Sequence, residues 1–283
     1  MMKNNLKNKT KMRVTKYLLF PTLLVITMLM INSCETDETQ TVTTLTNLVM
    51  ADEFDTEGAP DSSLWTYDIG RGPNGDGWGN QELQFYTDNS ENVRIENGFL
   101  LITAKEETID GALYTSARLK TQGIFEQQYG RFEARIRMPY GKGLWPAFWL
   151  LGNDCDVNEW PLCGEIDIME YLGDRPTTIF GSVHGPGYSA GQSEGKPYSL
   201  TNGRFDTGFH VFGIEWGPNY INYYVDGDLY NQITPDDVEG EWVFDHPFYI
   251  IINMAVGGLL PGSPDEDTEF PQTMVVDYVR VYQ

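Results

Sequence analysis

The sequence is poor in the side chains that bind metals and nucleic acids. Histidine occurs only three times in 283 residues, which argues against a site built from several histidine ligands. Lys and Arg number 19 against 41 Asp and Glu, and the formal net charge is −22. A chain this acidic repels phosphate backbones. Nucleic acid is therefore excluded as a partner, and anionic polymers are poor ligands.

Helical periodicity is also missing. From Leu48 onward no stretch of ten residues repeats its apolar positions with a helical period, and there is no internal repeat or linker. Residues 131–138 instead alternate charged and apolar side chains, and Asp226-Gly227 separates two β-prone runs. Asn97-Gly98 marks a second turn, and residues 275–282 are typical of a final strand. The pattern predicts one all-β domain over residues 48–283, a sandwich or jelly roll of two antiparallel sheets.

The N-terminus is typical of an export signal. Residues 2–16 carry six basic residues and no acidic one, and the apolar stretch 17–31 is shorter than the roughly 20 residues of a membrane-spanning helix. The ending Ile31-Asn32-Ser33-Cys34 resembles a bacterial lipobox. We predict a lipoprotein signal peptide over residues 1–33, a lipidated Cys34 and a flexible acidic tether over residues 34–47. The alternative is an uncleaved membrane anchor.

This interpretation places the protein outside the cytoplasm, anchored at the outer membrane or cell surface, or secreted. Cys155 and Cys163 then remain as an even pair in an oxidising compartment, which predicts a disulfide between them. Two free thiols are the alternative. The lipid is the only membrane contact that we expect, and a monomer is the default.

Three carboxylates fall within six residues of an apolar, β-prone segment. Glu165 and Asp167 share one face of a strand, and strict alternation places Glu170 on the other. A β-bulge near Met169 would return Glu170 to the same face. The two Glu carboxyls would then lie roughly 5–6 Å apart, close to the separation in retaining glycosidases. The charge of Asp167 would keep one neighbour protonated, as a general acid requires. Purely structural acids are the alternative.

Tryptophans near turns and strand ends offer flat rings that could stack on sugars. Candidates for a groove wall are Trp78, Trp145, Trp149, Trp160 and Trp216. Each ring taken singly is more typical of a position in the core. The glycine-rich motifs at residues 70–75 and 187–191 match dinucleotide and serine-hydrolase fingerprints, but neither is followed by a helical segment.

With its neighbours, the carboxylate cluster resembles the ExDxxE signature of glycoside hydrolase family 16, in the laminarinase (endo-β-1,3-glucanase) branch. The other matching segments are 77–84, 114–118, 143–149, 160–164, 253–258 and 276–282. The resemblance implies a β-jelly-roll with a concave cleft and a retaining double displacement. It also implies that Glu165 is the nucleophile, Glu170 the acid/base and Asp167 the residue that tunes the nucleophile. The segment 152–162 is long for the branch and is expected to reshape a cleft wall.

The resemblance implies two further sets of residues. The substrate-binding set is Asn80, Glu82, Arg118, Trp145, Trp149 and His184, with His184 near the leaving-group side or else a structural loop residue. Catalysis needs no cofactor. A structural Ca²⁺ is implied on the convex face, with Glu53, the Gly98 carbonyl and Asp277 as its ligands.

The expected substrate is a β-1,3-glucan such as laminarin, with mixed-linkage β-1,3-1,4-glucan as a second substrate. One alternative is a family 16 hydrolase of another polysaccharide, such as agarose or a related galactan. Sulfated polymers fit an acidic chain poorly. Another alternative is a non-catalytic glucan-binding surface lipoprotein. The intact acids argue against that alternative.

Overall fold

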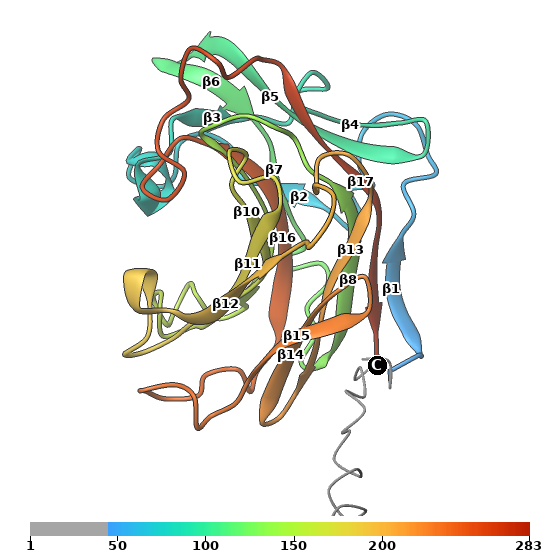
Figure 1. Ribbon diagram of the computed structural model, residues 1–283, viewed down its shortest axis with the longest axis vertical. Coiled ribbons are helices and arrows are strands. Elements are labelled where there is room, and N and C mark those ends of the chain that lie inside the picture. Colours follow the sequence, from blue (N-terminus) through green and yellow to red (C-terminus); the bar gives the residue numbers. More distant parts are fainter. Residues whose placement is uncertain (1–44) are drawn as a thin grey trace, which may run out of the picture. The chain divides into compact units, whose positions relative to one another are not determined.

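The computed structural model describes residues 45–283, which form two β-sheets packed face to face (Figure 1). The prediction of an all-β jelly roll is confirmed. The predicted signal peptide, Cys34 and most of the predicted tether lie outside the described residues. Within residues 45–283, no helix has both the length and the apolar character needed to cross a bilayer.

The larger sheet has ten strands. Their order is β15-β14-β13-β8-β17-β5-β6-β3, with β1 on β17 and β4 on β5. All pairs are antiparallel except β3 with β6. The strands are β1 (Leu48–Asp52), β3 (Gln84–Tyr86), β4 (Val93–Glu96), β5 (Phe99–Ile109), β6 (Ala112–Ser116), β8 (Gly130–Arg137), β13 (His210–Gly217), β14 (Tyr220–Val225), β15 (Asp228–Ile233) and β17 (Gln272–Tyr282).

The smaller sheet has seven strands in the order β12-β11-β10-β9-β16-β7-β2. They are β2 (Thr66–Tyr67), β7 (Arg118–Lys120), β9 (Leu144–Gly152), β10 (Glu165–Tyr171), β11 (Thr178–His184), β12 (Glu194–Ser199) and β16 (Phe248–Val256). Two short helical turns, η1 (Gly77–Gln81) and η2 (Ala190–Gln192), complete the described elements. Trp78 and Gly79 inside η1 have positive φ, so the glycine-rich stretch before it opens no regular helix.

The turn signals in the sequence form the expected hairpins. Asp226 and Gly227 both have positive φ, at 53° and 89°, and join β14 to β15. Asn97 and Gly98 do the same between β4 and β5, with φ of 55° and 77°. Two consecutive left-handed residues match the right-handed twist of the strands that they connect. The final strand begins at Gln272, slightly before the predicted Val275.

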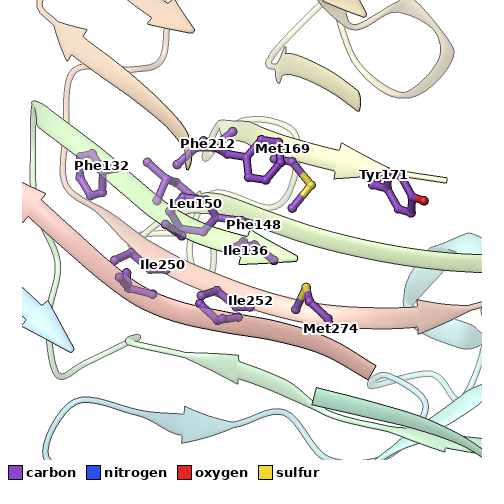
Figure 2. Packing of buried hydrophobic residues seen from close by; sticks show 14 of the residues in the cluster. Phe132, Ile136, Phe148, Leu150, Met169, Tyr171, Phe212, Ile250, Ile252 and Met274 are labelled. Atoms are coloured by element: carbon purple, nitrogen blue, oxygen red, sulfur yellow. The ribbon is translucent and has the colours of Figure 1, made fainter. Parts of the chain in front are cut away.

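The core lies between the two sheets (Figure 2). Alternate residues of each strand point inward, and those shown are fully or almost fully buried. The larger sheet contributes Phe132, Ile136, Phe212 and Met274, and the smaller sheet contributes Phe148, Leu150, Met169, Tyr171, Ile250 and Ile252. Because one face of the smaller sheet is fixed against this core, its other face is left to form a site.

Trp216 belongs to this core, so its candidacy for a groove wall was wrong. It lies on β13 in the larger sheet and is 1% exposed. Its ring packs edge-on against Tyr129 and Phe248, and its Nε1 donates a hydrogen bond to the Phe244 carbonyl at 3.1 Å. Because Trp216 points inward from β13, its apolar ring is buried and its single hydrogen-bond donor has a partner.

Both ends of the described chain are fixed to the larger sheet. The backbones of Asn47 and Gln283 exchange two hydrogen bonds, of 3.2 and 2.8 Å. The amide of Leu45 donates to Glu215 at 3.3 Å, and Arg131 donates to the Leu45 carbonyl at 3.4 Å. The last residues of the predicted tether are therefore hydrogen-bonded to the domain.

Candidate active site

A β-bulge in β10 places all three signature acids on one face of the smaller sheet. The register between β10 and its neighbours shifts after Asp167, so Glu165 lies opposite His184, Asp167 opposite Ser182 and Glu170 opposite Phe180. Residues directly opposite each other in antiparallel strands share a face. Between the acids, Ile168 and Met169 both enter the core, at 2% and 0% exposure. The predicted bulge is confirmed.

The acids line a cleft of about 800 Å³ on this face. Side chains from β7, β9, β10, β11, β12 and β16 form its floor, and the turn at η1 and the loop after β16 contribute to its walls. The whole predicted substrate-binding set lines the same cleft: Asn80, Glu82, Arg118, Trp145, Trp149 and His184.

Each acid has different hydrogen-bond partners. Trp160 donates its indole N–H to Glu165 at 2.7 Å, and Trp145 donates to Glu170 at 3.0 Å. Ser182 donates to Asp167 Oδ2 at 2.8 Å, and the same oxygen lies 3.0 Å from His184 Nε2. His184 Nε2 is also 4.0 Å from Glu165. His184 therefore lies beside Asp167 and Glu165. The cross-strand partner of Glu170 on β11 is Phe180, which carries no charge.

Burial and mutual repulsion hold protons in this cluster. Burial raises the pKa of Glu165 and of Glu170 to about 8, and the charge of Asp167 acts in the same direction. Burial opposes the charge on His184, but the carboxylates of Asp167, Glu165 and Glu170 outweigh it and raise the His184 pKa to about 9. His184 is thus an imidazolium at neutral pH, and its charge favours ionisation of Glu165, which lies 4.0 Å away.

Beyond the acids, a cation lies between two indoles on the cleft wall. The Arg118 guanidinium lies 4.6 Å from the Trp78 ring centroid and 4.8 Å from that of Trp149. Asp68 forms an ion pair with Arg118 at 2.9 Å. Because the guanidinium of Arg118 contacts both rings, this stack restricts rotation of the Trp149 indole.

A buried chain of hydrogen bonds fixes Trp149 from behind. Trp149 Nε1 donates to Asn253 at 2.7 Å, Asn253 donates to the Tyr86 hydroxyl at 3.0 Å, and Tyr86 donates to Glu82 at 3.3 Å. Glu82 is only 4% exposed, and burial raises its pKa. Sequence analysis placed Glu82 in the site but missed Asn253, although Asn253 begins one of the segments that carried the resemblance.

Two more cleft residues were absent from the predicted set. Trp160 was considered only as one of several rings, yet it contacts Glu165 directly. Its position in the segment 160–164, next to the signature, was the available signal. Phe180 lines the cleft opposite Glu170, and only the register of β11 could have identified it.

The loop before β10 carries Trp160 and is closed by a disulfide. Cys155 and Cys163 are bonded, with their Cα atoms 5.0 Å apart, so the predicted pairing is confirmed. Trp160 lies inside the closed loop and is 45% exposed. This segment was expected to reshape a cleft wall, and Trp160 does line the cleft.

The three predicted calcium ligands lie on adjoining segments of the larger sheet. Glu53 follows β1, Gly98 precedes β5, and Asp277 lies on β17, which pairs with both strands. Each carboxylate, however, is paired with an arginine: Glu53 with Arg280 at 2.7 Å, and Asp277 with Arg135. The oxygen donors suit Ca²⁺, but these pairs would have to open to admit it. Calcium binding stays a prediction.

Comparison with known proteins agrees with this geometry. The family model of Glycosyl hydrolases family 16 matches residues 78–280. A beta-glucanase from Rhodothermus marinus is 46% identical over 248 residues, which cover 83% of this chain and 85% of that protein.

Two solved structures are similar over most of their length. The laminarinase catalytic domain from Thermotoga maritima MSB8, in complex with cetyltrimethylammonium bromide, is 50% identical with a TM-score of 0.80, over 84% of this chain and 98% of that one. The endo-β-1,3-glucanase from Pyrococcus furiosus is 49% identical with a TM-score of 0.80, over 86% and 98%. The matched residues include the whole carboxylate signature on β10, and the chain therefore belongs to glycosyl hydrolases family 16 and is a glycoside hydrolase.

Proposed function

We propose that the protein is a retaining endo-β-1,3-glucanase that hydrolyses laminarin-like glucans, with mixed-linkage β-1,3-1,4-glucan as a second substrate. The observation that carries the proposal is the bulge in β10, which aligns Glu165, Asp167 and Glu170 on the cleft floor. The similar proteins named as laminarinase and endo-β-1,3-glucanase support the choice of glucan.

In the first half of the reaction, Glu170 protonates the glycosidic oxygen while Glu165 attacks the anomeric carbon from the opposite face. The bond to the leaving sugar breaks, and a covalent glycosyl-enzyme forms on Glu165. The raised pKa of Glu170 supplies the proton at neutral pH. The pKa of Glu165 is raised to the same level, so the two glutamates compete for protons. The imidazolium of His184 and the indole N–H of Trp160 lower the pKa of Glu165 and favour the form in which Glu165 is ionised and Glu170 is protonated.

In the second half, Glu170 has lost its proton and acts as a base toward water. The water attacks the anomeric carbon, its proton passes to Glu170, and the bond to Glu165 breaks. Two inversions leave the product in the β configuration. Asp167 accepts from Ser182 and lies against His184, so its role is to hold the imidazolium next to Glu165.

The extent of the cleft supports internal cleavage. It is lined by residues from β12 at one edge to β7 near the other, which spans five inter-strand steps. At about 4.8 Å a step this is roughly 24 Å, longer than a single sugar ring. A site of this length binds several consecutive sugars and favours endo action.

Product analysis tests the substrate. The purified protein is incubated with laminarin, barley mixed-linkage glucan and agarose, and the released oligosaccharides are separated by size. We expect a ladder from laminarin and none from agarose. A ladder from agarose alone would keep the chemistry and reassign the substrate to a galactan. If no polymer yields reducing ends, binding of laminarin would favour the glucan-binding alternative.

The charge of His184 sets the acid side of the pH profile. His184⁺ lowers the pKa of Glu165, so replacing it by the neutral asparagine removes that effect and raises this pKa. Because the nucleophile must be ionised, the acid limb of kcat/KM for His184→Asn should move to higher pH by about one unit or more. His210→Asn is the control, since His210 lies on β13 and pairs with Asp226 outside the cleft. An unchanged acid limb in His184→Asn would refute this role.

A further inference from the structure

We propose that Phe180 forms the binding platform for the leaving-group sugar, and that it determines how strongly the enzyme depends on a glucosyl ring beyond the scissile bond. This inference rests on the proposed function. It concerns a side chain that has no polar atom and takes no part in the proton transfers.

The bulge in β10 places Phe180 beside Glu170. Glu170 lies directly opposite Phe180 on β11 and Ala147 on β9, whereas Glu165 lies opposite His184 and Leu151. Since opposed residues share a face, Phe180 reaches the cleft immediately beside the acid/base. The next strand continues the same row, because Pro197 of β12 lies opposite Phe180. Both residues line the cleft.

The chemistry of Glu170 identifies what lies over Phe180. The acid must touch the glycosidic oxygen, and that oxygen departs with the leaving sugar. The leaving ring therefore contacts the immediate neighbours of Glu170. Ala147 is too small to provide a platform. Trp145 is held by its N–H bond to Glu170, so Phe180 and Pro197 are the apolar surface left on the β12 side.

Neighbouring residues leave the platform accessible. Ser182 lies between Phe180 and His184 on the same face of β11. Its partner on β12 is Gly195, which has no side chain. Ser182 turns its hydroxyl toward Asp167. Phe180 is half-buried, and among residues 45–283 no other aromatic ring stacks on it. Its free surface suits the apolar face of a β-glucosyl ring.

The test compares two substrates with different leaving groups. Laminarihexaose places sugars on both sides of the scissile bond, whereas β-laminaribiosyl fluoride releases a fluoride ion too small to reach Phe180. In Phe180→Ala, kcat/KM for the hexaose should fall about tenfold, the effect of one lost stacking contact, while that for the fluoride stays within about twofold. Phe180→Trp should restore most of the activity on the hexaose.

Leu151→Ala is the matched control, because Leu151 is the cross-strand partner of Glu165 and not of Glu170. Any loss in this variant should be equal for the two substrates. Equal losses in Phe180→Ala, or a loss on the fluoride alone, would overturn the platform. Failure of the unaltered protein to cleave either substrate would instead refute the proposed function.

Discussion

Glu165→Ala should hydrolyse laminarin at least about 10⁴-fold more slowly than the unaltered protein, while its affinity for laminarin persists. The substitution removes the proposed nucleophile, so no glycosyl-enzyme is expected to form. The indoles of Trp145 and Trp149 and the Arg118 stack remain in place to bind glucan. Hydrolysis is measured as released reducing ends, and binding by calorimetry or affinity electrophoresis.

Added azide identifies the role of Glu165 in the same variant. Azide fits the space left by the carboxylate and attacks an activated laminaribioside once, so the expected product is the α-glycosyl azide. Glu159→Gln is the control, since Glu159 is an exposed acid on the disulfide loop. Retained activity in Glu165→Ala, or a β-azide product, would show that another residue is the nucleophile.

Glu170→Ala should lower laminarin hydrolysis by about 10³-fold through loss of the proton donor. A 2,4-dinitrophenyl laminaribioside needs no protonation to depart, so formation of its glycosyl-enzyme should be nearly unaffected. The burst of dinitrophenol measures that step. Azide then attacks the glycosyl-enzyme on Glu165, and two inversions give the β-glycosyl azide. An α-azide, or equal losses on both substrates, would exclude Glu170 as the acid/base.

Thermal unfolding of Glu170→Gln gives an independent measurement. Burial raises the pKa of Glu170 from 4.5 to about 8, so its stabilising contribution is complete below pH 4.5 and is lost as the pH rises through 8. The neutral amide has no such dependence. The Tm of the variant relative to the unaltered protein should therefore increase between about pH 4.5 and 8.

Much of the fold could be predicted because the strand signals are local. The alternation in residues 131–138 and the turn at Asp226-Gly227 depend only on neighbouring residues, and both are confirmed. The acids could be placed because a single bulge is the smallest change that brings Glu170 to the face of Glu165 and Asp167. The separation of the two Glu carboxyls stays a prediction.

The cleft outside β10 depends on register, which the sequence does not express. Every residue of β16 is buried, so no alternation tells which side chains face the core and which face the cleft. Only the pairing of Asn253 with Ala147 and of Ile251 with Trp149 assigns their face. Phe180 was missed for the same reason, and Trp216 was misjudged because an indole suits a core as well as a groove.

Charge pairing over long sequence separations was equally hidden. Glu53 and Asp277 were expected to bind calcium, but each meets an arginine from a distant part of the chain. The burial of Glu133 and Glu215 in the larger sheet could not be predicted from the sequence either. Their alternation with apolar residues in the sequence is typical of solvent-facing positions.

The hydrogen bonds between Asn47 and Gln283 make the domain a nearly closed loop. A short linker would be enough to join these residues, and new termini could be opened in an exposed hairpin such as Asp226-Gly227. Because the joined ends lie on the sheet that does not carry the cleft, a circularly permuted enzyme would keep its catalytic strand intact. The chain termini could thus be moved without altering the strand that carries the three acids.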